Sequence, residues 1–178
     1  MAGLAAVPLL SHGVYAQPVD ATLERRVKAA FLYNFVAYLG LPPRAFDGPG
    51  APVVMGIMGD AALADELSVI VANRSIWGRN FVVRTVRETE DLRGVTVLFV
   101  GRSENTRLAA LARATGNLPM LIVTESEGAL EQGSVINFVV KDGRVKFDVA
   151  LDAAEKRGIK LSSRLLTVAQ QVRPGNEP

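Results

Sequence analysis

The sequence predicts a three-layer α/β domain with a mainly parallel sheet, an antiparallel C-terminal hairpin and flanking helices. Apolar runs typical of buried strands alternate with helical segments as far as Thr124. A hairpin signal and two short helices then follow. No repeat, low-complexity stretch or linker marks a second domain, so we expect one domain over 17–178, long enough to bury a core of its own.

The first element is a helix over 19–39, which Gly40 ends and Pro42-Pro43 prevents from restarting. The next expected elements are a strand over 53–58, a helix over 61–72 with Asp60 as N-cap, and strands over 81–86 and 95–100. A helix from N-cap Ser103 to about Gly116 and a strand over 120–124 follow. The last two expected helices cover 152–157, which Gly158 follows, and 162–172, with Ser162 as N-cap.

Asp142-Gly143 is the preferred residue pair of a two-residue type I′ hairpin turn. This turn fixes the register, so that Phe138 faces Phe147 and Asn137 faces Asp148. One face of the hairpin then carries Ile136, Phe138, Val140, Val145, Phe147 and Val149, which suits a core.

The first 16 residues have the pattern of a secretory leader. Residues 4–10 form a short apolar centre, and small residues precede a cleavage point after Ala16. The mature chain is then expected to begin at Gln17 and to be periplasmic. A frayed N-terminal tail is the other interpretation.

Composition argues against catalysis. The chain has no cysteine, and its single histidine, His12, lies in the expected leader. The mature chain would therefore lack His acid–base groups, Cys nucleophiles and the usual zinc or copper ligands, so we expect no enzyme, no metal site and no cofactor. A net charge of +2 without a basic run gives no sign of nucleic-acid binding.

The first helix is apolar almost all the way round, so its own domain, a second copy or a partner must cover it. Phe31, Asn34, Phe35 and Tyr38 share one face. They are the expected dimer or partner interface, and we expect a homodimer. Asn34 either bonds a neighbouring backbone group or sets the register of self-pairing.

Two polar groups are candidate partner- or ligand-binding sites. Asn137, Lys146 and Asp148 share one face of the hairpin, where they form either a solvated ion pair or a polar floor for a ligand. Ser162, Ser163 and Arg164 open a helix, as an ordinary cap or as a cradle for a small anion, which Arg79 could join.

Seven segments, in order, resemble the YfiR family of small periplasmic regulators, also described as the DUF4154 domain. They are Val27 to Phe35, Gly78-Arg79, Gly94 to Val100, Leu121 to Glu125, Val135 to Val139, Phe147-Asp148 and Gly158 to Leu166. The resemblance covers roughly 23–172. Many relatives carry Cys near Gly56 and Val95, and a Phe-Glu-Ile-Asn pattern where this chain has Phe147-Asp148-Val149-Ala150.

The resemblance implies a protein that represses an inner-membrane diguanylate cyclase by binding its periplasmic domain, which lowers cyclic-di-GMP and biofilm formation. The alternative is a periplasmic sensor or solute-binding module for a small anion. A pocket at the carboxyl ends of the strands that contains Arg79 or Arg164 would favour this alternative.

Overall fold

The computed structural model describes residues 20–87, 92, 94–116 and 118–175. The expected leader, its cleavage point and the first expected residue of helix 1 lie outside these ranges. In chain order the elements are α1 (Ala21–Val36), β1 (Leu39–Gly40), the 3₁₀ turn η1 (Pro43–Ala45), β2 (Val53–Met58), α2 (Ala61–Val71), β3 (Ser75–Ile76), β4 (Arg79–Thr85), β5 (Val95–Val100), η2 (Arg102–Arg107), α3 (Leu108–Ala114), β6 (Leu121–Thr124), β7 (Ile136–Lys141), β8 (Arg144–Ala150), α4 (Leu151–Lys156), β9 (Lys160–Leu161), α5 (Ser163–Val168) and β10 (Gln171–Arg173).

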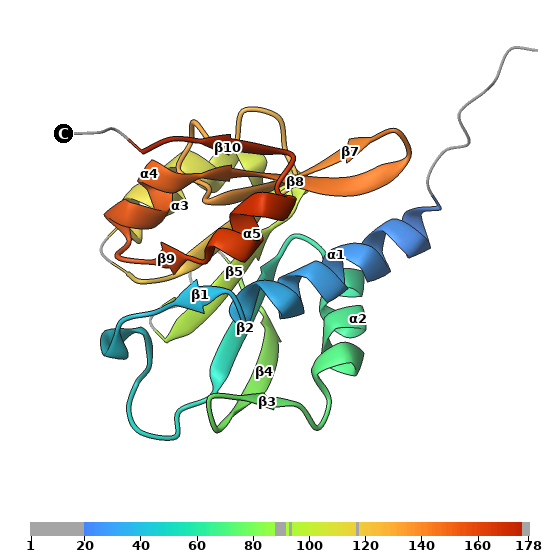
Figure 1. Cartoon of the computed structure of the whole chain (residues 1–178). Coiled ribbons are helices and arrows are strands. Elements are labelled where there is room, and N and C mark those ends of the chain that lie inside the picture. Colours follow the sequence, from blue (N-terminus) through green and yellow to red (C-terminus); the bar gives the residue numbers. More distant parts are fainter. Residues whose placement is uncertain (1–19, 88–91, 93, 117, 176–178) are drawn as a thin grey trace, which may run out of the picture.

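A large, mainly parallel sheet carries the fold (Figure 1). Its strand order is β10-β8-β7-β6-β5-β2-β4-β3, and β1 pairs with β9 in a small antiparallel sheet. Strands β4, β2, β5, β6 and β7 run parallel, whereas β8 returns antiparallel to β7. The predicted mixed α/β class is therefore confirmed, and the three-layer arrangement stays a prediction. No helix in the described part of the chain is long and apolar enough to cross a bilayer.

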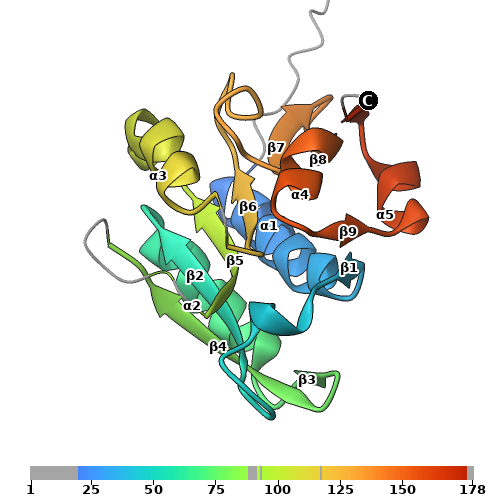
Figure 2. The ribbon, with the colours of Figure 1, turned by 90° about the vertical axis from the view of Figure 1, so that its left-hand side faces the viewer.

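The central strands supply two hydrophobic clusters, because successive side chains point to opposite faces. Val97 and Phe99 join the cluster that includes α1 and α2, whereas Leu98 and Val100 join Leu108 of α3. Figure 2 shows α3 well apart from α1, with the central strands between them. Strands that are buried on both faces explain the continuous apolar runs in the sequence.

The hairpin β7–β8 has the predicted register: Phe138 pairs with Phe147 and Asn137 with Asp148. Asp142 and Gly143 adopt φ angles of 52° and 67°, as a type I′ turn requires. The local turn chemistry was thus sufficient to align the two strands.

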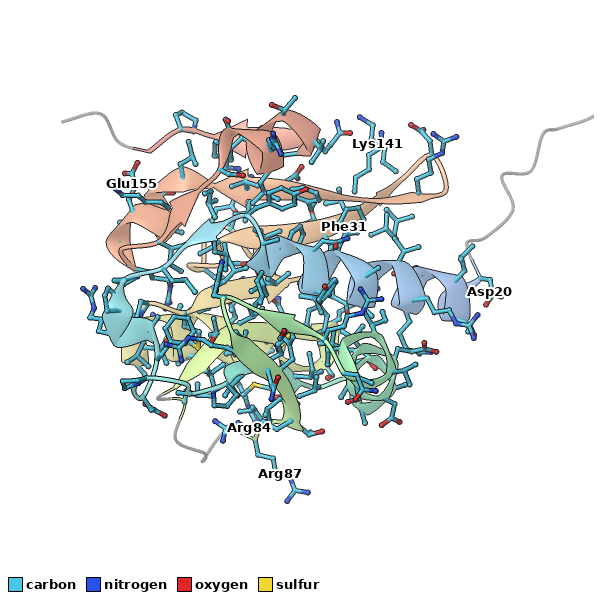
Figure 3. The ribbon with its side chains drawn as sticks, turned by 60° about the horizontal axis from the view of Figure 1, so that its bottom comes forward. Asp20, Phe31, Arg84, Arg87, Lys141 and Glu155 are labelled. Carbon is cyan, nitrogen blue, oxygen red and sulfur yellow. The ribbon has the colours of Figure 1, made fainter. Side chains whose placement is uncertain are left out.

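Helix α1 lies across the hairpin and is covered on one side by its own domain. Phe35 is 1% exposed, and its ring centroid is 5.0 Å from that of Phe147 and 5.8 Å from that of Phe138. Phe31 projects from α1 towards the same hairpin (Figure 3), with its ring centroid 5.5 Å from that of Phe147. Phe35 is therefore a core residue, which corrects its expected place at an interface with a second subunit.

Two helix predictions need correction. The segment after β5 begins as the 3₁₀ turn η2, and Ser103 does not cap α3; its hydroxyl donates instead to the Gly59 carbonyl at 3.3 Å. The last helix ends at Val168 rather than Val172, because the chain turns into β10, whose Gln171 to Arg173 pair in parallel with β8. The short strands β1, β3 and β9 were also not predicted.

Phe35→Ala should lower the free energy of unfolding by about 3–5 kcal/mol, because it empties a fully packed aromatic site. Chemical denaturation monitored by circular dichroism measures this change. The control is Leu23→Ala on the same helix, where the side chain is 55% exposed, and the loss should stay within about 0.5 kcal/mol. Equal losses in the two variants would contradict the assignment of Phe35 to the core.

Candidate functional site

A cavity of about 430 Å³ opens at the carboxyl end of β6, and we call it the β6-end cavity. It forms because β6 stops at Thr124, which pairs with Asn137 of β7, whereas β7 continues beyond that pair. Its polar lining comes from α1, from the segment after β6, from the hairpin and from β10: Lys28, Arg102, Glu125, Ser126, Glu127, Glu131, Asn137, Asp148 and Arg173. The carboxyl ends of parallel strands are the usual place for ligands in such sheets.

Lys28 is the buried charge at one side of the cavity. Its side chain is 8% exposed, and its ammonium group forms ion pairs with Glu24, one turn earlier on α1, and with Glu125 at 2.5 Å. Glu125 immediately follows β6, and its other oxygen accepts from the Arg102 backbone N–H at 3.1 Å. Two acids around one lysine tie α1 to the ends of β5 and β6.

A hydroxyl network orients Asn137 at the floor of the cavity. The Thr124 hydroxyl donates to Asn137 Oδ1 at 2.7 Å and lies 2.9 Å from the Ser134 hydroxyl. Ser134 donates to the Ile136 carbonyl at 2.8 Å. Within the described residues no hydrogen bond from the Asn137 amide nitrogen is found, although the residue is only 7% exposed. The amide nitrogen is therefore a donor that the cavity can use.

Asp148 lies opposite Asn137 across the hairpin, as predicted. Burial raises the pKa of its carboxyl group above the ordinary 3.8, although Arg173, the Gln171 backbone N–H and Lys141 act in the opposite direction. Asp148 Oδ1 is buried without a hydrogen-bond partner in the described part of the chain. Its ionised form is thus incompletely compensated by the protein itself.

The other predicted site residues are not gathered here. Lys146 is on the Asp148 face of the strand, half-buried, and pairs in register with Val139. Arg79 holds the loop before β2: it donates to the Gly48 and Ala51 carbonyls at 3.1 and 2.5 Å and stacks on the Phe46 ring at 4.1 Å.

The serine–arginine group at α5 is separate from Arg79. Ser162 caps α5 by accepting from the Leu165 N–H at 3.3 Å, and Ser163 and Arg164 are exposed. Arg79 lies at the β4 end of the large sheet and α5 beside the opposite end (Figure 1). The fold therefore does not join the two groups, and neither Arg79 nor Arg164 lines the β6-end cavity.

The proposed interface residues of α1 differ in exposure. Asn34 and Tyr38 are exposed, Phe31 is half-buried, and Phe35 belongs to the core. Asn34 thus does not lie on the buried face of the helix. Only the exposed residues of this set could contact a second molecule.

Sequence reasoning missed Lys28, Glu125, Ser126 and Arg173 as site residues. Two signals pointed to them: a lone lysine within an apolar helix, and a glutamate directly after a buried strand. The place of Arg173 depended on β10, which was expected to be helical. Its guanidinium pairs with Glu131 at 2.5 Å.

Lys28→Met should destabilise the domain by about 3–5 kcal/mol, because it leaves two acids at a largely buried position without their cation. Urea denaturation measures the change. The control is Lys156→Met, which breaks an exposed pair with Asp152 of 3.2 Å and should cost less than about 1 kcal/mol. A loss for Lys28→Met no larger than the control would show that the buried pair does not hold α1 in place.

Asp148→Asn should make the protein more stable than wild type near pH 7 and equally stable near pH 3. A raised pKa means that the folded state binds the proton more tightly than the unfolded state, so wild-type stability falls as pH rises above 3.8 and Asp148 ionises. Thermal melts at several pH values measure the difference. Asp142→Asn, at the exposed hairpin turn, is the control and should show no such gain with pH. A gain that is the same at both pH values would contradict the linkage to Asp148.

Comparison with known proteins places this fold and its motifs in a family. No curated protein matches the chain. A conserved domain protein of Vibrio cholerae O1 biovar eltor str. N16961 has the same fold, with 10% identity and a TM-score of 0.57, covering 84% of this chain. The ABC domain from Streptococcus pneumonia in complex with L-Trp is 12% identical with a TM-score of 0.57, covering 82% of this chain. The chain spans 60% of the length of each. The model of the DUF4154 family, described as YfiR/HmsC-like, matches residues 25–170, and the chain therefore belongs to this family.

Proposed function

We propose that this protein is a periplasmic regulator that binds the periplasmic domain of an inner-membrane diguanylate cyclase and represses it, lowering cyclic-di-GMP and biofilm formation. The observation that carries the proposal is the family match over 25–170, which spans nearly all of the described domain. The family suggests a periplasmic regulator, and the identity of the cyclase partner is our proposal.

The mechanism we propose is a shift of population. A protein that regulates a membrane enzyme by binding it acts through differential affinity for the active and inactive states of that enzyme. The packing of the domain supports such a role, since the hairpin and α1 form one packed unit through Phe31, Phe35 and Phe147. The hairpin end, with Val140 48% exposed, offers an apolar contact on the face opposite Lys146 and Asp148.

Self-association remains part of the proposal. Asn34 on the outer side of α1 and Tyr38 just after the helix are exposed and, with the half-buried Phe31 beside the hairpin, would form the homodimer contact. The loop after β1, over 42–46, is near the same end of the helix. Phe35 is excluded, because a second subunit could not reach it without unfolding the domain.

The second candidate function is a sensor for a small solute, and the β6-end cavity favours it. The Streptococcus protein of similar fold is described in complex with L-Trp, so a fold of this kind can hold a small molecule. An anion held by Arg79 or Arg164 has little support here, because neither residue lines the cavity. Regulation by a solute and binding to a cyclase are compatible in one protein.

Deleting the gene should raise cyclic-di-GMP, and only while the partner cyclase is present. Lys146→Ala, Asp148→Ala and Arg164→Ala test the hairpin and α5 as contacts, with Lys156→Ala as an exposed control on α4, 74% exposed at the side chain. At least one of the three variants should stay folded by thermal melt yet lose repression, because truncating an interface anchor commonly costs more than about 1 kcal/mol of binding. If all three variants repressed normally, the contact with the cyclase would lie on α1 or the loop after it instead. Unchanged cyclic-di-GMP on deletion would refute the cyclase proposal.

A further inference from the structure

The β6-end cavity contains polar atoms that the protein leaves unsatisfied. Among the buried side-chain atoms of the described residues, four have no hydrogen-bond partner: Arg25 Nε, Asn105 Oδ1, Ser126 Oγ and Asp148 Oδ1. Two of these four, from Ser126 and Asp148, belong to residues that line this one cavity. Buried polar groups are normally paired, so their concentration at a cavity points to an occupant.

Of the two residues, Ser126 gives the clearer evidence of an unsatisfied polar group. The residue is 6% exposed, it directly follows Glu125, and its hydroxyl has no partner within the part of the chain that the structure describes. A hydroxyl kept from water without a hydrogen bond costs roughly 1–3 kcal/mol. On the same lining, the Asn137 amide nitrogen has no hydrogen-bond partner among the described residues, although it is not one of the fully buried unpaired atoms.

Some charged side chains of the cavity lining have an ion-pair partner in the described part of the protein, whereas others have none. Lys28 is paired with Glu125 at 2.5 Å, and Arg173 with Glu131 at 2.5 Å. Arg102 and Glu127 are exposed at the rim. Asp148 has no ion pair within 4.0 Å among the described residues, and it is half-buried. The inner cations therefore have partners, whereas the inner carboxylate does not.

We propose that the β6-end cavity binds a small molecule with a primary ammonium group, which donates hydrogen bonds to the Asp148 carboxylate and to the Ser126 hydroxyl. The apolar part of the ligand packs against Leu130 and Val139, which also line the cavity. A volume of about 430 Å³ falls within the usual range for small-molecule sites.

A cation suits this lining better than an anion. An anion would meet an unpaired carboxylate. The buried cation Lys28 is already paired with Glu125, and the partly exposed Arg173 is paired with Glu131. The charged groups that face Asp148 are Arg173 on β10 and Lys141 on β7, with Lys146 two residues away on β8. Lys141 is exposed near the hairpin end (Figure 3), where water screens it. Arg173 forms an ion pair with Glu131.

Ligand affinity should depend on pH in a defined direction. Burial raises the pKa of Asp148 above 3.8, so at low pH the carboxyl group is protonated and cannot pair with an ammonium group. Affinity should therefore rise with pH as Asp148 ionises, and level off once it is fully ionised. This dependence is measured on the wild-type protein and needs no variant.

The test uses n-butylamine as the probe and butanoate as the matched anion, with binding to the purified chain followed by NMR chemical-shift changes. We expect butylamine to shift resonances of residues 125–131 and of the hairpin, with saturation, and butanoate to bind at least tenfold more weakly. Asp148→Asn should weaken butylamine binding at least tenfold, and Ser126→Ala severalfold. Asp142→Asn removes the same charge from the hairpin turn outside the cavity and should leave binding unchanged.

The opposite results are equally clear. Equal or tighter binding of butanoate would overturn the proposal in favour of an anion site. No saturable shift with butylamine would mean that the cavity holds water alone. If Asp142→Asn weakened butylamine binding as much as Asp148→Asn, binding would depend on the net charge of the protein and not on a site at Asp148. If Asp148→Asn fails to fold, the wild-type pH dependence and Ser126→Ala decide. Because all measurements use the purified chain, their outcome is independent of the cyclase proposal.

Discussion

The structure depends on one packing contact, the burial of helix α1 against the hairpin β7–β8. Phe35 is 1% exposed and lies with its ring centroid 5.0 Å from that of Phe147, more than a hundred residues along the chain. The contact joins the first helix to strands β7 and β8, which lie far along the chain. It also places Lys28, two turns earlier on α1, at the carboxyl end of β6.

The candidate site follows from this contact. Lys28 reaches Glu125 because α1 is held against the hairpin, and Glu125 then binds the backbone of Arg102 after β5. At the point between β2 and β5, where the strand order reverses and a ligand is normally expected, the segments after the two strands pack closely, and a second cavity of about 370 Å³ lies beside them. A Cβ atom on Gly59 would lie 2.7 Å from Ser103 Oγ. The shorter β6 leaves the open space one strand further along the sheet.

The two proposed roles use different parts of the molecule. Contact with a membrane cyclase needs an exposed surface, which Val140 provides at the hairpin end and Tyr38 provides just after α1. Ligand binding needs enclosed polar groups, which Ser126, Asn137 and Asp148 provide. Asp148 belongs to both descriptions, because it lies on the hairpin face proposed for the partner and lines the cavity. A ligand at Asp148 would therefore change the charge of that surface.

The sequence by itself determined the α/β class, the family, β2 and β5, the Asp60 cap of α2 and the full register of the hairpin. These features depend on local turn chemistry, capping and the apolar runs of strands buried on both faces. Only the tertiary structure decided that Phe35 is core, that Arg79 holds a loop, and that Lys28, Ser126 and Arg173 meet Asp148 in one cavity. The sequence could not show these, because each results from contacts between segments far apart in the chain. The strand β10 is the clearest case: Gln171 to Arg173 become a strand because the edge of β8 is there to pair with them.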